Sequence, residues 1–298
     1  MPSKEAIALR AALMKIRPLV IEQHIENGRK MQDRLGKLAT AVKHGDVRIT
    51  DVEMPGFSAA RIVPVGAPAD PRCILYLHGG AYVMGGIEYS KGFGSVLARD
   101  MGLRVFCCAY RLAPEHPYPA ALEDALCAYD YLIGQGFAPR DIVLAGESAG
   151  GGLVFCLLLK LKQLGRALPR CAVAMSPWTD LTCSGATYRE NADTDPTIER
   201  EMLLFYADLY AKGVLRDPLV SPLFGDLRGL PPTLIIAGGA EMILDDSRLL
   251  AARLNAVGSP ARLHVEPGMW HVYPLYGTPE AKAALELANA FLQEMGHE

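Results

Sequence analysis

The sequence predicts an α/β fold in which one mostly parallel sheet carries helices on both faces. Short apolar runs alternate along the chain with longer segments that have helical spacing. The chain has 298 residues, of which 50% are hydrophobic, and this is enough to bury one large core. We therefore expect a single domain over residues 1–298 with an eight-stranded sheet.

The apolar runs and the helical segments can be assigned in chain order. Residues 1–45 have helical, amphipathic spacing, interrupted by Pro18 and Gly28, and form either a lid or a packing layer. Helices are also expected from about Pro119, from Ser148, over 197–212, from about Leu244 and at the C-terminal end after the last strand. The predicted strands are VRITDVEM (47–54), FSAARIVPV (57–65), CILYLH (73–78), LRVFCCAY (103–110), DIVLA (141–145), RCAVAMSP (170–177), PTLIIAGG (232–239) and ARLHVEP (261–267).

One segment interrupts this alternation. Residues 183–230 join two core strands over a length that no short crossover needs, and they include the helix expected at 197–212. We interpret the excursion as part of a cap over the functional site. The cap is then contributed by residues 1–45 and by about 183–225.

Charge and composition restrict the classes of partner. The formal net charge is −3 and no block of like charge is present, so we expect no nucleic-acid binding and no stable membrane association. The N-terminus lacks an apolar signal core, which predicts a cytoplasmic protein with a small-molecule partner. The sequence is also compatible with a homodimer, because the strand at 261–265 would form an exposed sheet edge that could pair with a second copy of the chain.

The seven cysteines are an odd number and include no C-x-x-C pair, which predicts buried free thiols. None lies in a glycine-bounded turn beside a candidate base. The chain also has no H-E-x-x-H, G-x-G-x-x-G or P-loop motif, so the usual signals of zinc and nucleotide chemistry are missing.

A serine lies between two glycines where a predicted strand meets a predicted helix. The motif is GESAG at 146–150, and Ser148 is its central residue. A turn this tight forces the central residue into a strained conformation and needs small neighbours on both sides. The serine hydroxyl is then held out at a helix N-terminus, which makes Ser148 the candidate nucleophile.

A serine nucleophile needs a base, and the base needs a carboxylate. His271 follows the last predicted strand in the glycine-containing loop PGMWHVY (267–273), from which it can reach Ser148; otherwise it is a loop histidine that only packs. For the acid we favour Glu241, directly after the strand PTLIIAGG, with Asp245 as the alternative. All the carboxylates of this segment could instead form an ordinary negatively charged helix entrance.

Hydrolysis through a tetrahedral intermediate also needs N–H donors for an oxyanion. Gly79 and Gly80, directly after the strand CILYLH, are the predicted donors, with the N–H of Ala149 as the third. A pair of glycines after a strand is by itself often only a turn. Its place, one crossover before the serine motif, favours the oxyanion hole.

Five motifs together resemble the hormone-sensitive-lipase family of bacterial α/β-hydrolase carboxylesterases. They are HGGAYVMGG (78–86), YRLAPEHPYPAALED (110–124), GESAGG (146–151), SPWTDLT (176–182) and PGMWHVY (267–273). The resemblance runs from about residue 70 to the end of the chain and implies the α/β-hydrolase fold, a helical cap, and no metal or organic cofactor. The order serine, acid, histidine is that of the family's triad. Two residues depart from the family pattern, namely Ala81 for a third glycine and Glu241 for the usual aspartate.

These observations predict a serine carboxylesterase that hydrolyses short- to medium-chain esters through an acyl-enzyme. A lactonase, an amidase or a deacetylase would use the same triad, and a ligand-binding protein of this fold would lack an activated serine. We expect five further motif residues to hold the oxyanion loop by buried hydrogen bonds: His78, Tyr110, Arg111, Glu115 and Asp124. Five other residues are pocket walls or ordinary core: Tyr82, Met84, Trp178, Phe205 and Leu209.

Overall fold

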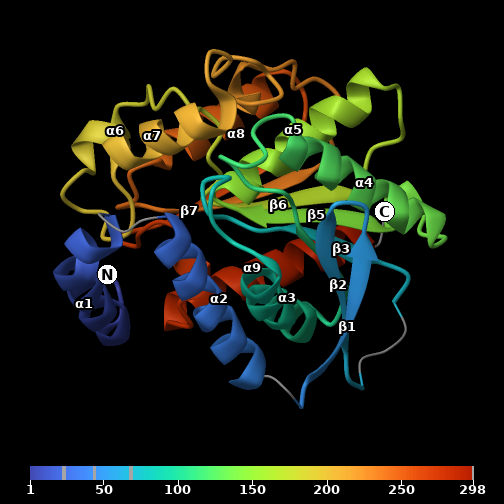
Figure 1. Cartoon of the computed structure of the whole chain (residues 1–298), viewed down its shortest axis with the longest axis horizontal. Coiled ribbons are helices and arrows are strands. Elements are labelled where there is room, and N and C mark those ends of the chain that lie inside the picture. The colour runs from blue at the N-terminus through green and yellow to red at the C-terminus, as the bar shows by residue number, and fades with distance from the viewer. Residues whose placement is uncertain (22–24, 43–44, 67–69, 297–298) are drawn as a thin grey trace.

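A twisted eight-stranded sheet lies between two layers of helices in the computed structural model (Figure 1). The structure describes residues 1–21, 25–42, 45–66 and 70–296. The strand order is β1-β2-β4-β3-β5-β6-β7-β8, in which β2 pairs antiparallel with β1 and β4 and the remaining neighbours are parallel. The predicted α/β fold with one mostly parallel sheet is therefore confirmed.

All eight predicted strands are present, and each strand begins and ends within two residues of its expected ends. Their bounds are β1 Val47–Met54, β2 Phe57–Pro64, β3 Cys73–Leu77, β4 Arg104–Ala109, β5 Ile142–Glu147, β6 Cys171–Met175, β7 Thr233–Gly238 and β8 Ala261–Glu266. The central strands β3, β5, β6 and β7 are buried along their whole length, which explains their uninterrupted apolar sequences. The outer strand β8 is only half-buried.

Helices cover both faces of the sheet. The longer helices are α1 Lys4–Ile21, α2 Ile25–Val42, α3 Ile87–Met101, α4 Ala120–Gly134, α5 Ala149–Gln163, α7 Arg200–Ala211, α8 Leu244–Ala256 and α9 Pro279–Gly296. Helices α4, α5 and α8 lie on one face, whereas α3 and α9 lie on the other (Figure 1). Two of the helices are not predicted from the sequence, namely α3 and the short helix α6 Thr187–Glu190 in the excursion.

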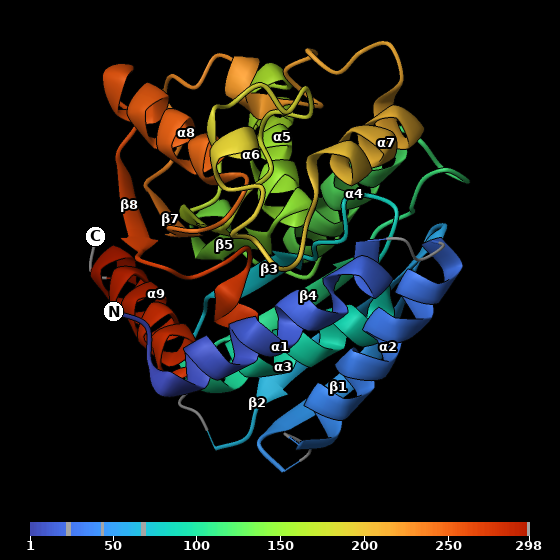
Figure 2. The ribbon, with the colours of Figure 1, turned by 90° about the vertical axis from the view of Figure 1, so that its left-hand side faces the viewer.

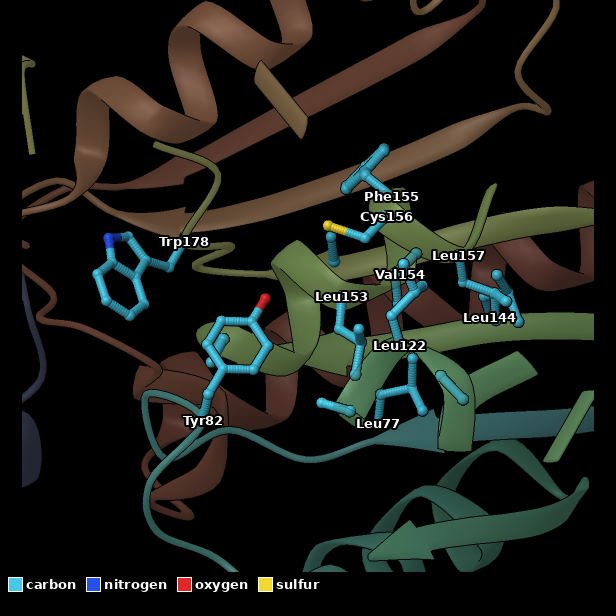
Figure 3. Packing of buried hydrophobic residues seen from close by; sticks show 14 of the residues in the cluster. Leu77, Tyr82, Leu122, Leu144, Leu153, Val154, Phe155, Cys156, Leu157 and Trp178 are labelled. Atoms are coloured by element: carbon cyan, nitrogen blue, oxygen red, sulfur yellow. The ribbon is translucent and has the colours of Figure 1, made fainter. Parts of the chain in front are cut away.

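Strand β3 shows how the two cores are separated. Leu75 and Leu77 point into the core under α4 and α5, while the alternate residues Ile74 and Tyr76 point into the core under α3 and α9. Figure 3 shows the first of these cores, where Leu77 packs among side chains of α4 and α5. All seven cysteines are free, and six of them are buried, as the sequence predicts.

The segments expected to form the cap are helical. Residues 1–45 form α1 and α2, with 22–24 and 43–44 outside the described residues, and the excursion carries α6 and α7 (Figure 2). Helix α2 packs tightly on α3, since a Cβ at Gly36 would lie 2.1 Å from the carbonyl oxygen of Glu88. Among the described helices, none is both long and apolar enough to cross a bilayer.

Candidate active site

Ser148 occupies a sharp turn between β5 and α5. Its backbone has φ 53° and ψ −123°, a conformation that non-glycine residues adopt only where the surroundings enforce it. Its N–H donates to the carbonyl oxygen of Met175 on β6, and its carbonyl oxygen accepts from the N–H of Trp178. These bonds hold the serine at the carboxyl end of the sheet, in the geometry of a nucleophile elbow.

The two motif glycines are required by close backbone approach. A Cβ at Gly146 would lie 2.5 Å from the carbonyl oxygen of Gly150. A Cβ at Gly150 would lie 2.0 Å from the carbonyl oxygen of Leu77 and 2.4 Å from that of His78. Backbone atoms cannot move aside as a flexible side chain can, so any larger residue would push α5 away from β3.

The loop after β8 brings His271 to the serine. His271 Nε2 lies 2.9 Å from Ser148 Oγ, so a neutral imidazole can accept the hydroxyl hydrogen bond. The loop is fixed next to the histidine, where the N–H of Val272 donates to Ser176 Oγ over 3.0 Å. The predicted contact between serine and base is therefore present.

Glu241 is the carboxylate on the other side of the imidazole. Glu241 Oε2 lies 3.5 Å from His271 Nδ1, and both side chains are buried. Asp245 is directed elsewhere: its carboxylate accepts from the Thr187 N–H over 3.1 Å and lies 3.5 Å from an Arg248 nitrogen. The loop geometry thus brings Glu241 to His271 and leaves Asp245 tying α6 to α8.

Burial acts on the protonation of both partners. It raises the pKa of Glu241 to about 8 and lowers the pKa of His271 to about 4, because neither charge is solvated. A low pKa keeps the imidazole neutral and ready to accept a proton. The raised pKa of Glu241 means that its ionised form is favoured toward alkaline pH.

The oxyanion loop differs from the prediction at Gly79. Its N–H donates to Glu147 Oε1 over 2.6 Å, so Gly79 is not a free oxyanion donor, and the role predicted for it is wrong. Gly80 and Ala81 have φ of 113° and 53°, and within the described residues their N–H groups have no hydrogen-bond partner. Ala149 is the first residue of α5, and the N–H groups of a helix's first turn have no acceptor within the helix.

Glu147 is a functional residue that the sequence analysis missed. It is fully buried beneath the oxyanion loop, and it accepts from the Gly79 N–H and from the Tyr89 hydroxyl over 3.2 Å. Burial raises its pKa to about 7. The only signal in the sequence is an acidic residue at the variable position of G-x-S-x-G, at the end of an otherwise apolar strand.

The comparisons with known proteins agree with this geometry. Residues 74–275 match a family model described as the alpha/beta hydrolase fold. A crystal structure of an esterase from the bacterial hormone-sensitive lipase family superposes with a TM-score of 0.89 and 35% identity, covering 99% of each chain. The chain belongs to the hormone-sensitive-lipase family of α/β-hydrolases.

Individual relatives in this family are similar over most of the chain. An acetyl-hydrolase from Streptomyces hygroscopicus is 41% identical over 76% of this chain and 77% of its own. An esterase from Acinetobacter venetianus is 36% identical over 72% of each chain. The esterase EstE5, whose crystal was soaked with p-nitrophenyl butyrate, superposes with a TM-score of 0.92 and 34% identity, over 99% of this chain and 100% of its own.

Two of the five motif residues expected to hold the oxyanion loop, His78 and Tyr110, bond to its backbone. Tyr110 stacks on the buried ring of His78 with centroids 4.3 Å apart, and its hydroxyl donates to the carbonyl oxygen of His78 over 2.6 Å. Arg111 donates to the buried Asp124 through its backbone and its guanidinium. Arg111 and Asp124 thus hold the segment after β4 to α4, and Glu115 is exposed and pairs with Arg29 of α2 at 2.8 Å.

The proposed wall residues divide into core and surface. Tyr82 stacks on Tyr210 of α7 with centroids 3.9 Å apart, and Trp178 is equally buried beside it (Figure 3). Phe205 on α7 is 57% exposed. Tyr82 and Trp178 therefore join α7 to the oxyanion loop and to the segment after β6, whereas Phe205 belongs to the outer surface.

Proposed function

We propose that the protein is a serine carboxylesterase in which Ser148, His271 and Glu241 form the catalytic triad. The observation that carries the proposal is the 2.9 Å contact between His271 Nε2 and Ser148 Oγ at a strained strand-to-helix turn. This contact gives a weak nucleophile an adjacent base, and Glu241 on the far side of the ring gives the base a compensating charge.

Acylation follows from this arrangement. Ser148 Oγ attacks the ester carbonyl carbon while its proton passes to His271 Nε2, and the carbonyl oxygen becomes an oxyanion. The N–H groups of Gly80, Ala81 and Ala149 receive that oxyanion. The protonated His271 then gives its proton to the leaving alcohol oxygen, the carbon–oxygen bond breaks, and the acyl group remains on Ser148.

Deacylation repeats these steps with water as the nucleophile. His271 takes a proton from water, the hydroxide attacks the acyl carbon, and a second oxyanion forms in the same place. The proton returns to Ser148 Oγ when the acid leaves. Glu241 stays ionised through both halves and stabilises the imidazolium each time it forms.

The substrate that we propose is a short- to medium-chain ester of a small, neutral molecule. Supporting this range are the acetyl-hydrolase among the relatives and the butyrate ester used with EstE5. We also propose that residues 1–45 and about 183–225 form a cap over the site, since α7 reaches the oxyanion loop through the Tyr82–Tyr210 stack. We propose no nucleic acid as a partner. A homodimer in which two copies pair along β8 stays a prediction, and sedimentation analysis would measure the oligomeric state.

The test is hydrolysis of p-nitrophenyl esters from acetate to laurate by the wild-type protein and by Ser148→Ala. We expect preference for acetate or butyrate and loss of turnover in the variant, with an unchanged circular dichroism spectrum. Unchanged turnover by Ser148→Ala would exclude the mechanism. Turnover of lactones, amides or acetylated amines in preference to these esters would keep the triad and change the substrate class.

A further inference from the structure

The segment before α7 is bonded to the loop that carries the triad acid. We define the cap loop as residues 191–198 and the acid loop as residues 239–243. Asn191 Nδ2 donates to the carbonyl oxygen of Glu241 over 2.8 Å, and Thr194 Oγ1 donates to that of Ala240 over 3.0 Å. The N–H of Met242 donates to Asp195 Oδ2 over 2.9 Å. Three successive residues of the acid loop are thus each held by a side chain of the cap loop.

Asp195 is the most unusual member of this contact. Its side chain is fully buried, although an isolated buried carboxylate is strongly disfavoured. It is held by three donors, namely the Met242 N–H and both the N–H and the hydroxyl of Thr197, at 3.0 and 2.8 Å. These bonds fix the carboxylate at the residue next to Glu241.

We propose that Asp195 is a positioning residue for the triad, which anchors the acid loop so that Glu241 faces His271. The proposal rests on the function proposed above and extends the triad into the cap. The triad acid sits on a turn without regular secondary structure, so its position depends on such bonds. A loss of alignment of even about 1 Å at a reacting group can cost roughly 100-fold in rate.

The charge of Asp195 has a second effect on the same site. Its negative charge raises the pKa of His271, against the lowering caused by burial. Burial raises the pKa of Asp195, and the imidazolium and the hydrogen bonds to the carboxylate oppose that rise. Glu241 faces His271 from the acid loop at 3.5 Å. The phenol of Tyr276, whose pKa is raised by burial and by the charge of Asp195, lies on the segment after His271. His271 therefore has carboxyl groups of two different segments around it.

Helix α1 supports the cap loop from outside. Arg10 donates to the carbonyl oxygen of Thr194 through Nε at 3.2 Å and through a terminal nitrogen at 2.7 Å. Arg17 donates to that of Ala192 at 3.0 Å. The N-terminal helix is thereby connected through the cap loop to the acid loop, and Asp195 is the buried link in that connection.

The test compares Asp195→Asn with Asp193→Asn. Asp193 lies in the same loop but is exposed, so Asp193→Asn removes an equal charge from the surface of the protein. We expect Asp195→Asn to lower kcat about 10- to 100-fold with KM changed less than about threefold. Asp193→Asn should match the wild-type protein in both measurements.

Two results would overturn the proposal: activity of Asp195→Asn within about twofold of wild type, or a KM raised as strongly as kcat is lowered. The second would indicate general loosening of the fold. If Asp195→Asn does not fold, Asn191→Ala removes one bond to the carbonyl of Glu241, and a kcat equal to wild type then refutes the positioning role. Activity retained by Ser148→Ala, by contrast, would refute the proposed mechanism itself.

Discussion

Replacing Glu241 with glutamine removes the charge of the proposed triad acid while keeping its shape. In the transition state His271 is an imidazolium, and its Nδ1 lies 3.5 Å from Glu241 Oε2. For an effective dielectric constant of about 20, the Coulomb attraction at this distance is about 4–5 kcal/mol. Each 1.36 kcal/mol corresponds to a tenfold change in rate, so kcat should fall by roughly three orders of magnitude.

The matched control is Asp245→Asn, because the sequence alone leaves both carboxylates open. Asp245 bonds to Thr187 and lies near Arg248, so its replacement should affect the packing of α6 against α8 and leave kcat within about twofold. The assay is steady-state hydrolysis of p-nitrophenyl butyrate, with circular dichroism for folding. A large loss of kcat in Asp245→Asn and none in Glu241→Gln would show that the wrong acid had been assigned.

Three further predictions concern the elbow, the buried Glu147 and the pH dependence. Gly150→Ala places a Cβ 2.0 Å from the carbonyl oxygen of Leu77 and should lower the free energy of unfolding, measured by urea denaturation, by about 3 kcal/mol or more. Gly134→Ala is the control: its added Cβ has no atom within 4 Å, so the free energy of unfolding should stay the same or rise slightly. Burial raises the pKa of Glu147 from 4.5 to about 7, so the contribution of Glu147 to stability is present below about pH 4.5 and is lost as pH rises through 7. Glu147→Gln should therefore remove roughly 3 kcal/mol of the pH dependence of the free energy of unfolding. Identical profiles of stability against pH for the variant and the wild-type protein would contradict this. The active form needs an ionised Glu241 and a neutral His271, and burial raises the pKa of Glu241 to about 8. We therefore expect kcat/KM to rise between pH 6 and about pH 8. A kcat/KM that already reaches its plateau at pH 6 would contradict this prediction.

The positions of the strands along the chain and the three residues of the proposed triad could be predicted from the sequence because each leaves a local signal. The central strands are buried on both faces and are therefore continuous apolar runs. Ser148 needs glycines around it, and His271 and Glu241 each follow directly after a strand that ends at the same edge of the sheet. Such signals depend only on neighbouring residues.

Gly79 was assigned wrongly because the direction of an N–H group is not encoded in a local pattern. Its partner Glu147 is 68 residues away in the sequence, and only the parallel pairing of β3 with β5 brings the two together. Asp195 was missed for a similar reason. It lies in a polar loop that resembles any surface loop, and its burial depends on packing against the acid loop, which is distant in the sequence.

The most direct test of the central claim is intact-protein mass spectrometry after treatment with an organophosphate, followed by peptide mapping. An activated serine attacks phosphorus, whereas the same fold acting only as a ligand-binding protein should not react. We predict one covalent adduct per chain, located on Ser148 and formed in parallel with the loss of esterase activity. An unmodified Ser148, or an adduct on Ser148 in protein that keeps its full activity, would contradict the account.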